Sequence, residues 1–251
     1  MKNSKIDSNF ISKPKPHVCK SNRPENMDSS QSFPTSGRLK PNTDLSLSRL
    51  LKLIPQGENP MYSYLLSTLK IVKNNYVQEG CAPNLQGDNI TLCTCKHFMR
   101  SFNSINEWPE YWIAGMKYPN HLFYLMKVKV AYPSMFDIWN GLNERTRNIK
   151  STLNNRYGDI YEPRRNNLRD LEKFDARNYR NSEFHVHADN WVCDINYSYF
   201  NGTKRPVYLV GDPNLSFIWT KPSITVNHPE ELQFTTGQKR WQLNEFLNQL
   251  S

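Results

Sequence analysis

The chain has 251 residues, of which 37% are hydrophobic, and it carries a formal net charge of +9. Its five cysteines are an odd number at irregular spacing, which excludes the disulfide framework of a small secreted domain. No stretch approaches the roughly 18 apolar residues that a membrane-spanning helix needs, and residues 1–11 contain no apolar core of signal-peptide length. We therefore expect an intracellular protein, in the cytoplasm or the nucleus, that contacts no membrane.

The first 43 residues predict a disordered basic tail. They are rich in Ser, Asn, Pro and Lys, and such a segment buries too little apolar surface to offset its conformational entropy. Residues 1–59 hold ten Lys or Arg against five Asp or Glu, so about half of the net charge lies in this part. The positive charge either forms a solvated basic surface or binds polyanions. We expect nucleic acid or a nucleotide as the partner.

Residues 44–60 predict a short amphipathic helix followed by a linker. Asp44 suits the helix N-cap, and Pro55 ends the pattern. Between them, apolar residues recur at helical spacing: Leu47, Leu50, Leu51 and Ile54. Such a helix either docks on the domain or binds another protein, and we favour docking because short helices are marginal in isolation.

Residues 61–251 predict one α+β domain around a curved, mainly antiparallel sheet or small barrel. Strands are expected at residues 61–72, 122–130, 206–210 and 217–226, with a turn at 211–214. The clearest strand is 122–130, where alternate residues are apolar and Lys127 and Lys129 occupy the other face near the end.

Helices are expected in the second half of this domain. Ser134 and Asp137 form a Ser-x-x-Asp capping box, and Gly141 lies near the predicted end of that helix. Residues 143–183 are dominated by Arg, Asn and Asp and predict a charged excursion with at most short helices. Residues 241–250 predict a last helical stretch that packs through its apolar side chains.

A Cys-x-Cys-x-His run formed by Cys93, Cys95 and His97 suggests two kinds of chemistry. Zinc favours thiolate and imidazole ligands, and His185 with His187 would supply a second pair, but the spacing differs from the usual hairpin. We favour buried thiols and assign no metal ligand and no cofactor. Alternatively, Cys95 is a nucleophile whose thiolate is favoured by neighbouring cations.

Two further segments combine polar groups that suit a nucleotide. Residues 156–165 are dense in arginine and tyrosine, which suit phosphate and base stacking, although Asp159 and Glu162 would instead pair with those arginines. In an extended chain, His185, His187 and Asp189 project to one side together. That arrangement suits a general base, a phosphate ligand or a metal, and equally an exposed strand edge.

Short motifs kept in order give the chain a resemblance to the nucleotide modification associated domains. The motifs are Ala82-Pro83-Asn84, Thr91-Leu92-Cys93-Thr94-Cys95-Lys96 with Arg100, Trp112-Ile113-Ala114-Gly115, Tyr124-Leu125-Met126-Lys127-Val128, Phe136 with Trp139, Gly158-Asp159-Ile160-Tyr161, His185 with His187, and Tyr208-Leu209-Val210-Gly211-Asp212. They cover residues 61 to about 222. The chain departs from the family pattern at Gln78, where an acidic residue is expected.

The resemblance implies a domain that recognises a base of a nucleic acid or nucleotide or helps to modify it. By analogy of fold, the strand and capped helix also resemble the small PUA-like barrels that bind modified bases. In an enzyme, the catalytic residues would be Cys95 as nucleophile, Asp159 as orienting carboxylate, and His185 or His187 as general acid or base.

The expected substrate-binding residues surround these catalytic candidates. Lys96 and Arg100 would stabilise an anion, and the remaining members of the polar pocket are Asn84, Thr94, Tyr161, Arg164 and Asp212. The alternative is a non-catalytic interaction protein, which its partners would recruit through the basic tail and the helix at 44–54.

Overall fold

A computed structural model of the chain describes residues 38–92, 96–185, 191–200, 205–227 and 238–251. The predicted tail therefore lies outside the described residues up to position 37. Within the described ranges, the helices are too short and too polar to cross a bilayer.

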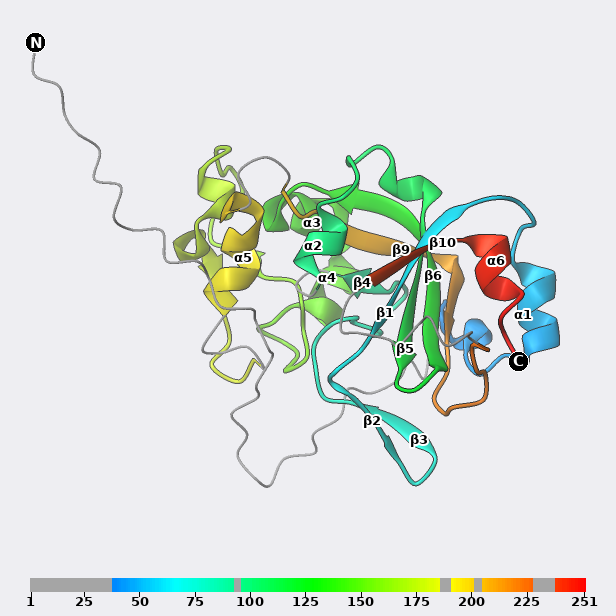
Figure 1. Cartoon of the computed structure of the whole chain (residues 1–251). Coiled ribbons are helices and arrows are strands. Elements are labelled where there is room, and N and C mark those ends of the chain that lie inside the picture. The colour runs from blue at the N-terminus through cyan, green and yellow to red at the C-terminus, as the bar shows by residue number, and fades with distance from the viewer. Residues whose placement is uncertain (1–37, 93–95, 186–190, 201–204, 228–237) are drawn as a thin grey trace, which may run out of the picture.

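A curled sheet of six strands forms the centre of the molecule (Figure 1). The strands are, in sheet order, β10 (Gln238–Gln242), β1 (Pro60–Leu65), β5 (Trp112–Lys117), β6 (His121–Tyr132), β9 (Tyr208–Ile218) and β4 (Thr91–Leu92). Neighbours run antiparallel except β1 and β5, which are parallel. The α+β prediction with a curved, mainly antiparallel sheet is therefore confirmed.

Strand β6 follows its predicted pattern closely. Leu122 to Met126 are all buried, because apolar residues occupy both faces of the strand there. Beyond them, Lys127 is half-buried and Lys129 is exposed while Val128 stays buried. The strand is thus covered on both faces in its first half and solvent-exposed on one face in its second half.

Strand β9 continues through residues 211–214, where the sequence predicts a turn between two strands. The prediction of two separate strands is therefore wrong. Gly211 pairs with Val128 and Ser216 with Met126, which places residues 212–215 opposite Lys127 alone. The Asp212 carboxylate accepts a hydrogen bond from the Asn214 backbone N–H at 2.8 Å. The turn-forming residues are therefore absorbed as a bulge, which interrupts pairing without ending the strand.

The predicted strand at 61–72 is divided between β1 and a projecting hairpin of β2 (Leu69–Val72) and β3 (Asn75–Gln78). Lys73 and Asn74 form its two-residue turn with φ values of 48° and 62°. Two successive residues in the left-handed region match the right-handed twist of the flanking strands.

Helix α1 (Leu47–Leu53) is docked on the domain rather than standing free. Leu50 is fully buried and Ile54 nearly so, both within the main core. The predicted N-cap is wrong, because Ser46 occupies that position. Asp44 has φ 55°, outside the extended region that an N-cap adopts. Its carboxylate instead accepts hydrogen bonds from the backbone N–H and the hydroxyl of Thr220, both at 2.7 Å.

Helix α3 (Met135–Gly141) begins as predicted, and Ser134 Oγ accepts a hydrogen bond from the Asp137 backbone N–H at 3.1 Å. The charged excursion contains only short elements, in agreement with the sequence. They are α4 (Glu144–Lys150), β7 (Glu162–Pro163), η3 (Glu172–Phe174), η4 (Ala176–Asn178) and β8 (Tyr179–Arg180). The remaining helices are η1 (Lys40–Asn42), α2 (His97–Arg100), η2 (Trp108–Glu110), α5 (Trp191–Phe200) and α6 (Leu243–Leu247).

Two hydrophobic cores share the sheet. The main core fills the curl of the sheet and is closed by α1 and α6, while the second core joins α3, α5 and the excursion at the opposite end (Figure 1). Strand β9 contributes to both, because Leu209 lies in the main core and its neighbours Tyr208 and Val210 lie in the second. The excursion thus packs against one face of strands β6 and β9, and polar side chains are buried along that junction.

Candidate functional site

Seven side chains form what we call the buried polar cluster, at the junction of the excursion and the sheet. They come from several parts of the chain and each is at most 5% exposed: Asn84, Thr91, Lys150, Asp159, Tyr161, His185 and Asp194. Buried charged residues are rare unless they are paired. The buried polar cluster is therefore the candidate functional site.

Lys150 is the centre of the first half of the cluster. It lies at the end of α4 and is fully buried, and its Nζ donates to the backbone and side-chain oxygens of Asn84 at 3.1 and 2.9 Å. Nζ also donates to Thr91 Oγ1 at 3.1 Å, and that hydroxyl donates to Asp159 Oδ2 at 2.6 Å. The Thr91 hydroxyl therefore joins a buried cation to a buried carboxylate, which compensates the desolvation of both.

Backbone contacts hold this half in place. Asn84 and Thr91 exchange two backbone hydrogen bonds, and the Asn84 amide donates to Tyr157 O at 2.9 Å. The backbone N–H groups of Asp159 and Ile160 both donate to Lys150 O. The loop after β3, the edge strand β4 and the excursion are thus fixed to one another.

Tyr161 is the centre of the second half. Its hydroxyl lies 2.8 Å from His185 Nε2 and 2.8 Å from Asp194 Oδ2. His185 Nδ1 lies 3.2 Å from the backbone oxygen of Arg156. The backbone oxygen of Asp194 accepts a hydrogen bond from Tyr208 at 3.0 Å, which anchors α5 to the sheet.

Electrostatics connect the two halves. Burial raises the pKa of Tyr161 well above its usual value, and the nearby Asp194, Cys81 and Asp159 raise that pKa further. Tyr161 therefore stays neutral and remains a hydrogen-bond donor across the physiological range. The Cys81 thiol is 1% exposed and acts electrostatically on Tyr161.

Arg100 lies next to the cluster through Tyr208. It is 1% exposed, its guanidinium donates to Val207 O, and its Cζ is 5.5 Å from the centre of the Tyr208 ring. The Arg100 side chain thus ties α2 to the start of β9.

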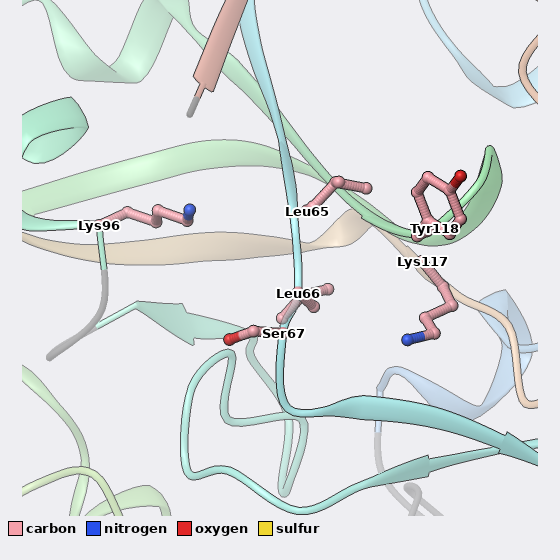
Figure 2. Close-up of a pocket in the computed structure, with 6 residues that line it drawn as sticks. All are labelled: Leu65, Leu66, Ser67, Lys96, Lys117 and Tyr118. Atoms are coloured by element: carbon pink, nitrogen blue, oxygen red, sulfur yellow. The ribbon is translucent and has the colours of Figure 1, made fainter. Parts of the chain in front are cut away.

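Lys96 belongs to a different surface. It has φ 58° at the start of α2, and its Nζ lies 5.1 Å from the centre of the Tyr64 ring. It lines a pocket of about 140 Å³ with Leu65, Leu66, Ser67, Lys117 and Tyr118, which Figure 2 shows.

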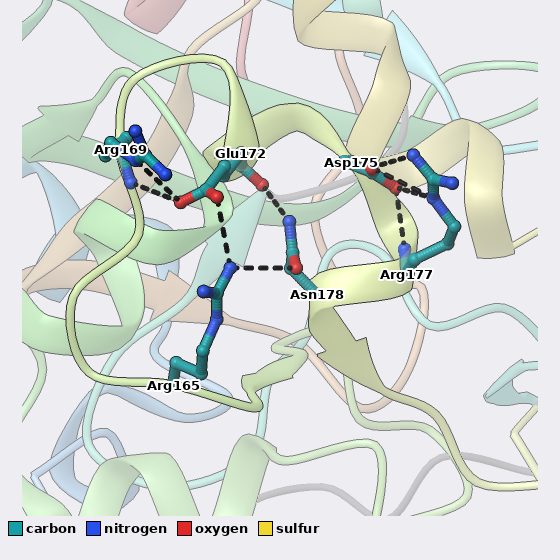
Figure 3. Close-up of polar contacts among 6 residues, drawn as sticks. All are labelled: Arg165, Arg169, Glu172, Asp175, Arg177 and Asn178. Carbon is teal, nitrogen blue, oxygen red and sulfur yellow. Dashed lines mark hydrogen bonds and ion pairs between the residues drawn. The ribbon is translucent and has the colours of Figure 1, made fainter.

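The arginines of the excursion are largely engaged with acidic partners (Figure 3). Arg165 lies 3.2 Å from Glu172, and Arg177 lies 2.6 Å from Asp175. A hydrogen bond from the Arg169 backbone N–H and the nearby Arg165 hold the pKa of Glu172 below its usual range.

The two acids that the sequence offered as partners for these arginines have other positions. Glu162 lies 3.8 Å from Arg180, and Asp159 is buried in the cluster. Arg164 is exposed, and its Nε donates to Tyr179 O at 3.0 Å. Asp212 belongs to the bulge of β9, where it accepts from Asn214.

Other residues singled out from the sequence fall outside the cluster or outside the described residues. Thr94, Cys95 and His187 are among the residues that the structure does not describe. His97 packs on the Phe98 ring with 4.4 Å between ring centres. Gln78 is fully buried and donates to Pro83 O at 2.9 Å, so it braces the Ala82–Asn84 loop. Among the described residues, no three His, Cys, Asp or Glu side chains gather as a metal would require.

The cluster brings together Asn84, Asp159, Tyr161 and His185 from the expected set, and it adds three residues that sequence reasoning missed: Thr91, Lys150 and Asp194. The sequence marks Asp194 only as the single charged residue of the segment 191–200, and nothing separates Lys150 from the other lysines. The arrangement offers neutral and charged donors and acceptors in fixed positions. Comparison of the chain with protein-family models, curated proteins and solved structures gave no significant match.

Proposed function

We propose that this chain recognises the base of a nucleotide or nucleic acid, or helps to modify it, at the buried polar cluster. One observation supports this most directly. Asp159, Tyr161 and His185 belong to the short motifs that resemble the nucleotide modification associated domains, and they lie in one cluster although the chain between them is largely polar surface.

The chemistry of the cluster suits such a ligand. Enzymes and readers that handle a single base hold its edge between fixed hydrogen-bonding groups in a closed environment. Tyr161 is a neutral donor held between His185 and Asp194. Ionisable groups with a perturbed pKa in buried surroundings are concentrated at functional sites.

A second surface, separate from the cluster, suits a phosphate group. Lys96 and Lys117 line one pocket with the Ser67 hydroxyl and the Tyr118 ring (Figure 2). Ammonium and hydroxyl groups suit phosphate oxygens, and Tyr118, which is 67% exposed, offers a face on which a base can stack.

The proposal is tested on the purified full chain. Its bound small molecules are released and identified by mass spectrometry, and mononucleotides, DNA and RNA oligonucleotides are then assayed for binding and for a change of mass. We expect salt-sensitive binding, which Tyr161→Phe and His185→Gln each weaken at least about fivefold, because a lost hydrogen bond to a buried group costs about 1–3 kcal/mol.

Tyr76→Phe is the matched control. Tyr76 is equally buried, and its hydroxyl donates one hydrogen bond to Leu122 O in the main core. It should bind like the unaltered chain. A change of mass assigns an enzyme, and binding without one assigns a reader. Absence of any nucleotide or nucleic-acid binding, or equal binding by all three variants, overturns the proposal, and capture of a protein partner in that case identifies an interaction protein.

A further inference from the structure

We infer that Tyr161, His185 and Asp194 form a proton relay that stores one more proton than a neutral histidine and an ionised aspartate would hold. The inference follows from three contacts in the second half of the buried polar cluster: His185 Nδ1 to Arg156 O, His185 Nε2 to the Tyr161 hydroxyl, and that hydroxyl to Asp194 Oδ2.

Each of these contacts needs its own proton. Arg156 O is a carbonyl oxygen and only accepts, so His185 Nδ1 must carry a hydrogen. Tyr161 has a single hydroxyl proton, and it serves either Asp194 or His185 but not both. The contact that it leaves unserved, at 2.8 Å, then needs a further proton on the other partner.

Counting the protons gives the charge of the relay. A neutral His185, Tyr161 and an ionised Asp194 supply two protons for three contacts and leave two lone pairs facing each other. The third proton makes either an imidazolium with a carboxylate or a neutral imidazole with a carboxylic acid. Both forms have no net charge, which burial favours over a charge of −1.

Among the surrounding charged groups, the Asp159 carboxylate acts in the same direction. The charge of Asp159 acts on Tyr161 along with that of Asp194, and Asp159 in turn is joined to Lys150 through Thr91. The Trp191 ring packs at 5.6 Å from the Tyr161 ring, and Tyr208 contacts the backbone of Asp194. The Arg156 guanidinium lies over the Tyr157 ring, 5.8 Å from its centre. A carboxylate facing the relay favours the extra proton.

The main form follows from the ordinary pKa values of the two ends. We assign the third proton to the more basic of the two groups, so that His185 is an imidazolium and Asp194 a carboxylate. Relay consists of two coupled transfers: the Nε2 proton moves to the Tyr161 oxygen as the Tyr161 proton moves to Asp194 Oδ2. No proton is gained or lost, and Tyr161 is neutral before and after.

Acid–base chemistry on a bound base would use this stored proton, and that use rests on the proposed function. The stored proton itself does not, so the two are tested separately. The full chain is labelled with ¹⁵N in its histidines, and the ring nitrogen shifts of His185 are followed from pH 5 to pH 9, without any ligand. His185→Gln assigns the signals.

We expect both ring nitrogens of His185 to stay protonated at least about 1.5 pH units above the usual midpoint of about 6.5. Asp194→Asn keeps an acceptor but removes the charge, and it should lower the His185 midpoint by at least about two units. Tyr161→Phe should uncouple His185 from Asp194, whereas Tyr76→Phe should leave the His185 titration unchanged.

A His185 midpoint near the usual value in the unaltered chain, or a singly protonated ring at pH 7, overturns the inference. The unaltered chain decides this alone, so the test stands even if Asp194→Asn fails to fold. Retained relay behaviour without nucleotide binding would overturn the proposed function only.

Discussion

The burial of Lys150 and the burial of Asp159 depend on each other. Both are fully buried, and the Thr91 hydroxyl bridges them. Lys150→Met should lower the free energy of unfolding by about 3–5 kcal/mol, because it leaves the Asp159 carboxylate buried without its cation. Urea denaturation measures the change.

The matched control for that prediction is a double-mutant cycle. Asp159→Asn removes the charge that Lys150→Met leaves behind, so the double variant should be more stable than the sum of the two single losses predicts. Additive losses would mean that the two side chains are not coupled.

At the same scale, the sequence indicated part of the site. Asp159, Tyr161 and His185 stand in recognisable polar and aromatic motifs. Lys150 and Asp194 do not, because the contacts that bury them join residues 66 and 33 positions apart.

At the scale of elements, two serines at helix N-caps provide a direct comparison. Ser134 Oγ accepts from the Asp137 N–H at the start of α3, whereas Ser46 at the start of α1 makes no such bond. Ser134→Ala should therefore lower the free energy of unfolding by about 1 kcal/mol, and Ser46→Ala by only a few tenths. Equal losses in thermal or urea denaturation would contradict this.

The docking of α1 gives a second prediction at this scale. Leu50 is fully buried, and Leu53 is 45% exposed on the same helix. Leu50→Ala should cost about 2–5 kcal/mol of stability because it opens a cavity in the main core, and Leu53→Ala should stay within about 0.5 kcal/mol. If instead only Leu53→Ala lowers the urea midpoint, the helix is not docked as described.

Local sequence patterns predict some of these elements and not others. The Ser134 N-cap of α3 and the alternation of β6 act within a few residues, so they were predictable. The bulge in β9 was not, because Gly211 to Asn214 favour a turn locally while pairing with β6 keeps the strand continuous.

At the scale of the whole molecule, buried tyrosines predict a loss of stability in alkali. Burial raises the pKa of Tyr76, Tyr161 and Tyr179 above the usual value of 10. Below pH 10 both the folded and unfolded chains keep these protons, and above it the unfolded chain releases them first. Unfolding then becomes easier by about 1.4 kcal/mol per pH unit for each such tyrosine.

Urea midpoints at pH 9 and pH 11 test this. The unaltered chain should be markedly less stable at pH 11, and Tyr76→Phe should lose about 1.4 kcal/mol less between the two conditions. An unchanged pH dependence in Tyr76→Phe would show that the Tyr76 proton is not retained on folding.

The α+β class, the main strands, the capped helix and the motifs that contain five of the seven residues of the buried polar cluster could be predicted from the amino-acid sequence, because periodicity, capping and turn chemistry act over short distances. The packing of the charged excursion against β6 and β9, and the burial of Lys150 and Asp194, are evident only in the folded chain. The physical reason is that a buried charge is stable only when distant segments supply its partners, and such pairing exists only in the folded chain.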